Sequence, residues 1–242
     1  MSKVTVNYLC LSFVILLFGT AGGSVMARKM AGGAAGWSFF WFALPFFTAI
    51  FACQCLVFPR ARTRLLYQLL FLGLLGLTMT WFMLSIILPV FWISPMAAMP
   101  KAVLAAVFAA ILAYNLVFGW RTLNQRWPGL GLPAFEHAYK PWDGTVNWDH
   151  VMRDMRIAPA IILPGVPDRW SAAVWIAIVA GVISGLVMKS AWPTFSAFSW
   201  SIPAILITAC INQFSGAYFA QAIKVRQLER DRKIVLKAWS KF

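Results

Sequence analysis

The chain has 242 residues, of which 61% are hydrophobic and only 12% are charged, and its formal net charge at pH 7 is +14. A soluble domain usually carries about 25% charged residues, so this composition excludes an ordinary water-soluble protein. Its apolar stretches are continuous, whereas the strands of a membrane barrel alternate apolar and polar residues over about ten positions. We therefore expect an all-α integral membrane protein.

Six apolar stretches approach or exceed the length of about 20 residues that crosses the hydrocarbon core of a bilayer. In chain order they lie near residues 4–26, 37–58, 65–92, 102–120, 170–192 and 202–223. The first follows Lys3 and ends in "GGSVMA", as a signal peptide would, but its apolar run is longer than a usual signal core, so we expect it to be retained. The predicted organisation is a four-span region (1–120), a hydrophilic loop (121–169), a two-span region (170–223) and a basic tail (224–242).

The basic residues are distributed very unequally between the two sides of this six-span layout. Seventeen of the 21 Lys and Arg residues fall on the side that carries both termini, and four fall on the other side. All seven acidic residues lie on the same side as the majority. Because Lys and Arg stay preferentially in the cytoplasm during insertion, we expect both termini to be cytoplasmic, and a bacterial inner membrane is our default location.

Two segments of the long loop differ in composition and in the structure that they predict. "RWPGLGLPAFEHAYKPWDG" is rich in Pro, Gly and aromatic residues and predicts an ordered irregular segment at the headgroups. "NWDHVMRDMR" predicts a short interfacial helix with Trp148, Met152 and Met155 on one face and Arg153 beside Asp149. We expect Trp148, Met152 and Arg153 to contact lipid or a partner protein.

The tail "KVRQLERDRKIVLKAWSKF" has the pattern of a basic amphipathic helix. Its apolar stripe comprises Leu228, Val235, Trp239 and Phe242, and its basic residues lie on the other faces. Such a helix binds anionic headgroups, at about 1 kcal/mol for each Lys or Arg near the surface. We expect membrane lipids first, another protein subunit second and nucleic acid least, with the following candidate residues: Arg226, Arg230, Lys233, Lys237 and Trp239.

The predicted spans contain no Asp, Glu, His or Arg, although intramembrane ionisable residues usually mark transport or catalysis. This pattern disfavours proton-coupled antiport and intramembrane proteases. His137 and His150 lie in the loop near Glu136, Asp143 and Asp149, but their spacing matches no known metal motif. We therefore expect no catalytic residue, no metal and no cofactor.

Small and amide side chains indicate where helices contact one another. Gly19 and Gly23 in the first span, and Gly181 and Gly185 in the fifth, form G-x-x-x-G pairs that allow close approach. Asn212 and Gln213 in the sixth span are expected to hydrogen-bond between helices, with a solute contact as the alternative.

These features predict a non-catalytic membrane subunit that anchors or assembles a larger complex, such as secretion or conjugative-transfer machinery, through its loop and tail. The alternative is a permease or channel subunit for a neutral or weakly polar solute, for example the membrane part of an ATP-driven exporter. A lipid-modifying enzyme that uses the histidines and acids of the loop is the third hypothesis.

Overall fold

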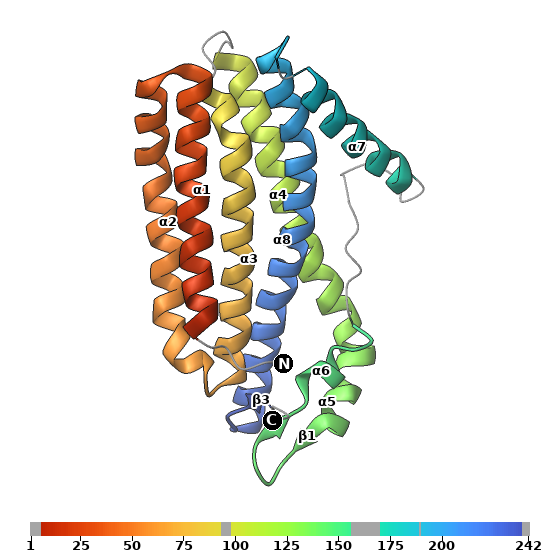
Figure 1. The fold of residues 1–242 in the computed structure, drawn as a ribbon. Helices are drawn as coiled ribbons and strands as arrows, with labels where there is room; N and C mark the ends of the chain where they lie inside the picture. The colour runs from red at the N-terminus through yellow and green to blue at the C-terminus, as the bar shows by residue number, and fades with distance from the viewer. Residues whose placement is uncertain (1–5, 93–97, 156–169, 189, 239–242) are drawn as a thin grey trace.

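The computed structural model describes residues 6–92, 98–155, 170–188 and 190–238. Five long helices lie side by side and form the body of the molecule (Figure 1): α1 (Val6–Ala31), α2 (Gly33–Ala61), α3 (Leu65–Ile87), α4 (Ala98–Arg126) and α8 (Pro193–Arg232). Helix α3 continues into a 3-10 turn, η1 (Leu88–Trp92). Another apolar helix, α7 (Ser171–Val187), leans away from the bundle and packs mainly against α8 (Figure 1).

Four helical stretches among the described residues are long and apolar enough to cross a membrane: Val6–Ala31, Gly33–Ala61, Leu65–Trp92 and Lys101–Ala138. They contain most of the first four predicted spans and support a membrane-embedded protein. Helix α7 has 17 residues, or about 26 Å at 1.5 Å per residue, slightly less than the hydrocarbon thickness of about 30 Å. Helix α8 has 40 residues and includes the sixth predicted stretch. The six-span count stays a prediction.

Glycines allow α8 to lie against its neighbours at backbone distance. A Cβ atom on Gly119 of α4 would overlap the carbonyl oxygen of Gln213 in α8, and one on Gly216 of α8 would overlap the backbone of α4. On the other side of α8, a Cβ on Gly76 of α3 would overlap the side chain of Ser215. Helix α8 is therefore packed between α3 and α4 by small residues, as is common between membrane helices.

Gly19 and Gly23 lie where α1 contacts α3 and α2. A Cβ on Gly19 would approach the Oγ of Ser85 to 2.8 Å, and one on Gly23 would overlap the ring of Phe39. The reversal between α1 and α2 passes through Gly32 at φ 90°, a backbone conformation that residues with a Cβ rarely adopt.

Buried polar side chains in this part of the bundle hydrogen-bond between helices. The Oγ of Ser12 donates to Oε1 of Gln54 (2.7 Å), while Nε2 of Gln54 donates to Oγ1 of Thr78 (2.9 Å). The indole Nε1 of Trp81, which is 4% exposed, donates to Oγ1 of Thr20 (3.2 Å). These bonds connect α1, α2 and α3.

The prediction that residues 126–144 form an irregular segment is wrong for its first part. Helix α4 continues instead into a π-helical turn, η2 (Trp127–Gly131), and then into α5 (Leu132–Ala138). Pro128 and Pro133 do not break this path, because each occupies one of the first positions of its helix, where the missing N–H has no intrahelical partner to lose.

The prediction of one amphipathic helix over residues 224–242 is also wrong in its second half. Helix α8 ends at Arg232, and Lys233 adopts the left-handed conformation (φ 53°), which reverses the chain. Val235 is then 42% exposed whereas Leu236 is fully buried, so the predicted apolar stripe does not form. Trp239 and Phe242 lie outside the described residues.

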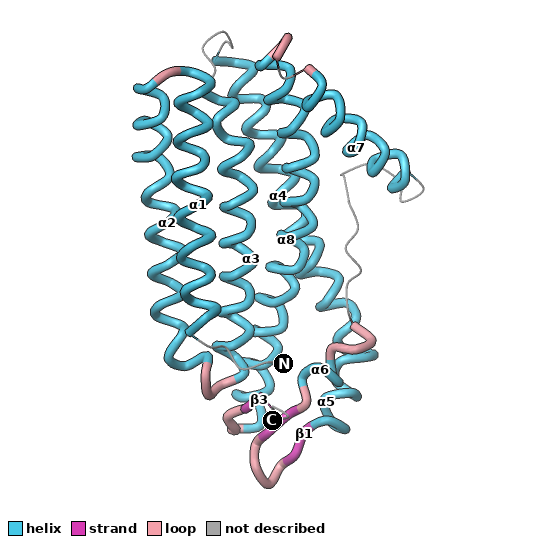
Figure 2. Tube along the Cα trace, viewed as in Figure 1, coloured by secondary structure: helices cyan, strands magenta, loops and turns pink. Residues whose placement is uncertain are grey.

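After this reversal the tail joins a small sheet with the order β1-β2-β3 (Figure 2). Strands β1 (Tyr139–Lys140) and β2 (Thr145–Val146) form an antiparallel hairpin. Strand β3 (Lys237–Ala238) pairs in parallel with β2, with Lys237 beside Thr145. The loop and the tail are thus hydrogen-bonded to each other, although about ninety residues separate them in the sequence.

Candidate functional site: the basal unit

The loop and the tail fold together at the end of the bundle where α1 and α3 begin and α8 ends (Figure 1). We call residues 127–155 and 234–238 the basal unit. Its apolar side chains share one core with the first turns of α3 and the last turns of α8. This core comprises Leu65, Leu69, Trp127, Phe135, Val146, Trp148, Val151, Met155, Ala222, Val225, Leu228 and Leu236.

Trp148, which we predicted to contact lipid or a partner, is buried in this core instead. The short helix expected in this region is present as one turn, α6 (Trp148–Val151), but its apolar face points inward. Trp148 is 2% exposed, and its Nε1 donates to Oε1 of Gln221 in α8 (2.9 Å). Met152 is partly buried against the same core. When Trp148 packs against α8, its indole N–H has a hydrogen-bond partner and its ring buries more apolar area than it would at the lipid headgroups.

An arginine near the end of α8 connects the tail to α5. The guanidinium of Arg232 pairs with the carboxylate of Glu136 and lies over the rings of Phe135 (5.0 Å to the centroid) and Tyr139 (6.0 Å). Because the arginine side chain is 34% exposed and the glutamate 49%, we expect each of these interactions to contribute about 1 kcal/mol or less.

Both backbone polar groups of Leu236 are bonded to helices of the bundle. Its N–H donates to Oε1 of Glu229 in α8 (2.9 Å), and its carbonyl oxygen accepts from the N–H of Leu65 at the start of α3 (3.0 Å). The first N–H groups of a helix have no intrahelical acceptor, so the tail supplies one to α3.

Five of the basic residues predicted to bind lipid or a partner are exposed: Arg153, Arg226, Arg230, Lys233 and Lys237. Arg230 has a side chain that is 81% exposed and lies 3.5 Å from the carboxylate of Asp231. Other basic side chains of the same end lie in the link from α2 to α3, whereas Arg28 and Lys29 lie in the last turn of α1 at the opposite end.

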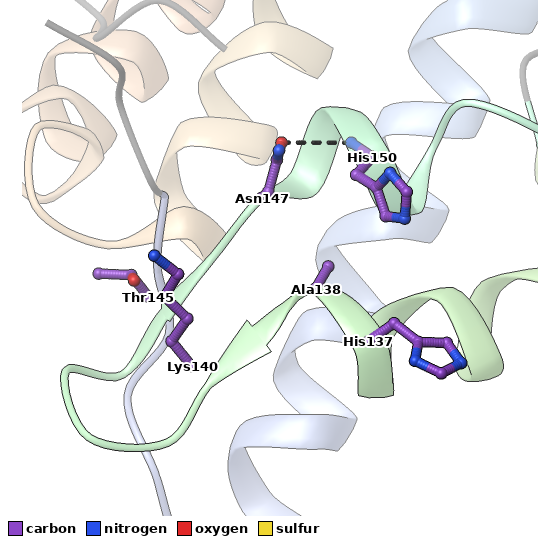
Figure 3. A pocket seen from close by; sticks show the side chains of 6 residues that line it. All are labelled: His137, Ala138, Lys140, Thr145, Asn147 and His150. Atoms are coloured by element: carbon purple, nitrogen blue, oxygen red, sulfur yellow. Dashed lines mark hydrogen bonds between the residues drawn. The ribbon is translucent and has the colours of Figure 1, made fainter.

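A pocket of about 210 Å³ opens in the basal unit between α5, the hairpin and α6. Its lining brings together the two histidines of the chain, His137 and His150, with Ala138, Lys140, Thr145 and Asn147. In Figure 3 the imidazole rings lie one above the other on the helical side, and Lys140 and Thr145 lie on the hairpin side. The Oδ1 of Asn147 accepts from the backbone N–H of His150 (3.3 Å).

The acidic residue of the hairpin, Asp143, is bonded within its own turn. Its carboxylate accepts from the Oγ1 (2.6 Å) and the backbone N–H (2.9 Å) of Thr145. These bonds, the side-chain bond first, lower the pKa of Asp143 below its ordinary value, and the positive charge of Lys140 adds to the effect.

Asn212 and Gln213 connect α8 to both of its neighbours in the bundle. The Oδ1 of Asn212 accepts from Oγ1 of Thr80 in α3 (2.7 Å), and its Nδ2 donates to the carbonyl oxygen of Leu112 in α4 (3.2 Å). The Nε2 of Gln213 donates to Oδ1 of Asn115 in α4 (2.7 Å).

Gly181 and Gly185 lie where α7 meets α8. The Oγ of Ser196 donates to the carbonyl oxygen of Gly185 (2.8 Å), and the hydroxyls of Ser184 and Ser199 are 3.0 Å apart. A Cβ on Gly181 would lie 3.3 Å from the carbonyl oxygen of Ser199.

Sequence reasoning missed Gly119 and Gly216, at which an added Cβ would overlap the backbone of the facing helix. Neither glycine belongs to a G-x-x-x-G pair in its own helix, so the available signal was only a single glycine in each of two apolar stretches.

Within the described residues, no three His, Cys, Asp or Glu side chains gather in a way that could hold a metal ion. Comparison with protein-family models, curated proteins and solved structures finds no match.

Proposed function

We propose that this chain is a non-catalytic integral membrane subunit that anchors or assembles a larger membrane complex through its basal unit. The chain would cross a bacterial inner membrane six times, with α7 and α8 as the last two crossings and both termini in the cytoplasm. Anionic lipid headgroups would surround the basic end of the bundle, and another protein subunit would bind the exposed face of the basal unit.

The observation that carries this proposal is the basal unit itself. A segment that only connected two spans would need no shared core with the tail. Here the loop and the tail bury twelve side chains together with α3 and α8, and exposed arginines and lysines remain on the outside. A folded unit with an apolar core and a basic surface suits docking to an acidic partner surface.

The interior of the bundle favours assembly over solute transport. Its amide side chains, Gln54, Asn212 and Gln213, make hydrogen bonds to neighbouring helices, so they hold helices together. Such bonds contribute about 0.6 kcal/mol each on average in membranes. Asp, Glu, His and Arg, which usually mark transport pathways, are absent from the predicted spans, and their one Lys, Lys189, lies near a span end.

The proposal that another protein subunit binds this chain is tested by gentle solubilisation and affinity purification of the full-length chain from its native membrane. We expect a stable stoichiometric protein partner that is retained by an Arg28→Gln/Lys29→Gln variant and depleted in an Arg226→Gln/Arg230→Gln variant. Each variant removes two exposed positive charges, from opposite ends of the bundle. A chain that purifies only with itself and carries solute flux in liposomes would contradict the assembly role and support the permease.

The orientation is tested separately by labelling single cysteines with a membrane-impermeant maleimide. In intact spheroplasts of a cysteine-free chain, we expect Lys101→Cys to react and Arg62→Cys and Lys237→Cys to react only after the membrane is opened. Reaction of Arg62→Cys and Lys237→Cys from opposite sides would exclude the six-span layout.

A further inference from the structure

The pocket of the basal unit presents hydrogen-bond donors and positive charge. None of its six lining residues is acidic. The Oδ1 of Asn147 accepts from the backbone N–H of His150 (3.3 Å), and the NH₂ group of this amide adds a donor. Lys140 adds an ammonium group, and each imidazole has at least one N–H to donate. With no carboxylate in the lining, this set of donors suits an anion.

Two acidic side chains close to the lining residues in the sequence are bonded to other residues. Glu136 pairs with Arg232 of α8. Asp143 accepts two hydrogen bonds from Thr145 within the hairpin turn. The carboxylates therefore balance part of the positive charge around the pocket without occupying its lining.

The pocket is also large enough for more than water. Its volume of about 210 Å³ is several times the share of about 30 Å³ that one molecule has in liquid water. Ala138, which has only a methyl side chain, lies between the histidine side and the hairpin side (Figure 3). A larger side chain at this position would fill the space.

We propose that this pocket binds a phosphate group, supplied either by a phospholipid headgroup or by a free phosphate compound. Phosphate oxygens accept charge-assisted hydrogen bonds from Lys and His side chains, which are shorter and stronger than neutral ones. Basic pockets at the cytoplasmic surface of membrane proteins bind lipid headgroups by this chemistry. None of the arginines that we assign to partner docking lines the pocket, so the proposal does not depend on the assembly role.

The test uses the small number of histidines in the chain. His137 and His150 are the only two, so full-length protein with isotope-labelled histidine gives two imidazole signals in an NMR spectrum, and His137→Gln assigns them. One titration adds inorganic phosphate to the protein in a neutral detergent. A second arm compares nanodiscs of phosphatidylcholine alone with nanodiscs that also contain phosphatidylglycerol.

Saturable shifts of both signals with inorganic phosphate, but not with chloride at equal ionic strength, support the proposal with a soluble source. Shifts that depend only on phosphatidylglycerol support it with a lipid source. Lys140→Gln should weaken the apparent affinity at least about tenfold, which corresponds to about 1.4 kcal/mol. Ala138→Leu should abolish the response, whereas Lys101→Gln, at the other end of the bundle, should change it less than about twofold.

Signals that do not move in either arm, or that move equally in chloride, would overturn the proposal. An unchanged affinity in both Lys140→Gln and Ala138→Leu would also overturn it. The wild-type titrations need no substitution, so the result does not depend on whether a variant folds.

Discussion

The contact between α4 and α8 makes Gly119→Ala the sharpest perturbation of this fold. The added Cβ would overlap the carbonyl oxygen and carbonyl carbon of Gln213. These are backbone atoms of a long helix, so no side-chain rotation can relieve the overlap, and α4 and α8 must move apart. Gly22→Ala in α1 is the matched control, because a Cβ at Gly22 meets no atom within 4 Å.

The expected loss has two parts. Overpacking a well-packed interior typically costs about 1–3 kcal/mol. Separation of the helices also stretches the bonds from Asn212 to Leu112 and from Gln213 to Asn115, which are worth about 0.6 kcal/mol each in membranes. We therefore expect Gly119→Ala to lower the free energy of unfolding by about 2–4 kcal/mol.

The assay is reversible unfolding of the purified protein in mixed micelles of neutral detergent and sodium dodecyl sulfate, followed by circular dichroism. Gly22→Ala should change the free energy of unfolding by less than about 1 kcal/mol, since it only replaces glycine by a better helix former. If Gly119→Ala were as stable as Gly22→Ala, α4 and α8 would not approach at backbone distance and the packing described here would be refuted.

Three further predictions concern the basal unit. Trp148→Phe leaves the buried Oε1 of Gln221 without the indole donor and should lower the free energy of unfolding by about 1–3 kcal/mol in the same assay; an unchanged value would place Trp148 outside the core. Arg232→Gln should destabilise by about 1 kcal/mol at low salt and by less at 1 M salt, because its ion pair is partly exposed; equal melting temperatures of variant and wild type at low salt would show that this pair contributes nothing. Thr145→Val removes the bond that most lowers the pKa of Asp143, so the pKa measured by NMR should rise toward its ordinary value. The bond to Thr145 contributes stability above the ordinary pKa of an aspartate, and that contribution is lost as the pH falls through the lowered one; an unmoved pKa in Thr145→Val would contradict this account.

The sequence predicts the helices of the bundle well because the length of an apolar stretch is a local property. The first four predicted spans each lie largely within a stretch that the structure makes helical and apolar enough to cross a membrane. Trp81, in the middle of the third predicted span, packs between helices and is 4% exposed. Hydropathy and residue type suffice for such inferences.

The basal unit could not be predicted in the same way because its structure depends on partners distant in the sequence. Trp148 and Met155 have the spacing expected of a helix that lies on the membrane surface. In the structure they are buried in the core that includes Leu228 of α8, where Gln221 accepts the hydrogen bond of the Trp148 indole. Lys233 adopts the left-handed conformation that ends α8, but glycine is the usual residue at such a position, so the lysine gives no sequence signal for it. The reversal there follows from bonds that Leu236 makes to α3 and α8.

The central claim is that the loop and the tail form one folded unit at the basic end of the bundle. It is tested most directly by cross-linking a cysteine-free chain that carries Thr145→Cys and Lys237→Cys, which are paired neighbours on β2 and β3. A short bismaleimide should join these two cysteines rapidly in native membranes. It should not join Thr145→Cys to Lys101→Cys, because residue 101 lies at the opposite end of the bundle. Failure of the first pair to cross-link while both cysteines react with a simple maleimide would contradict the account.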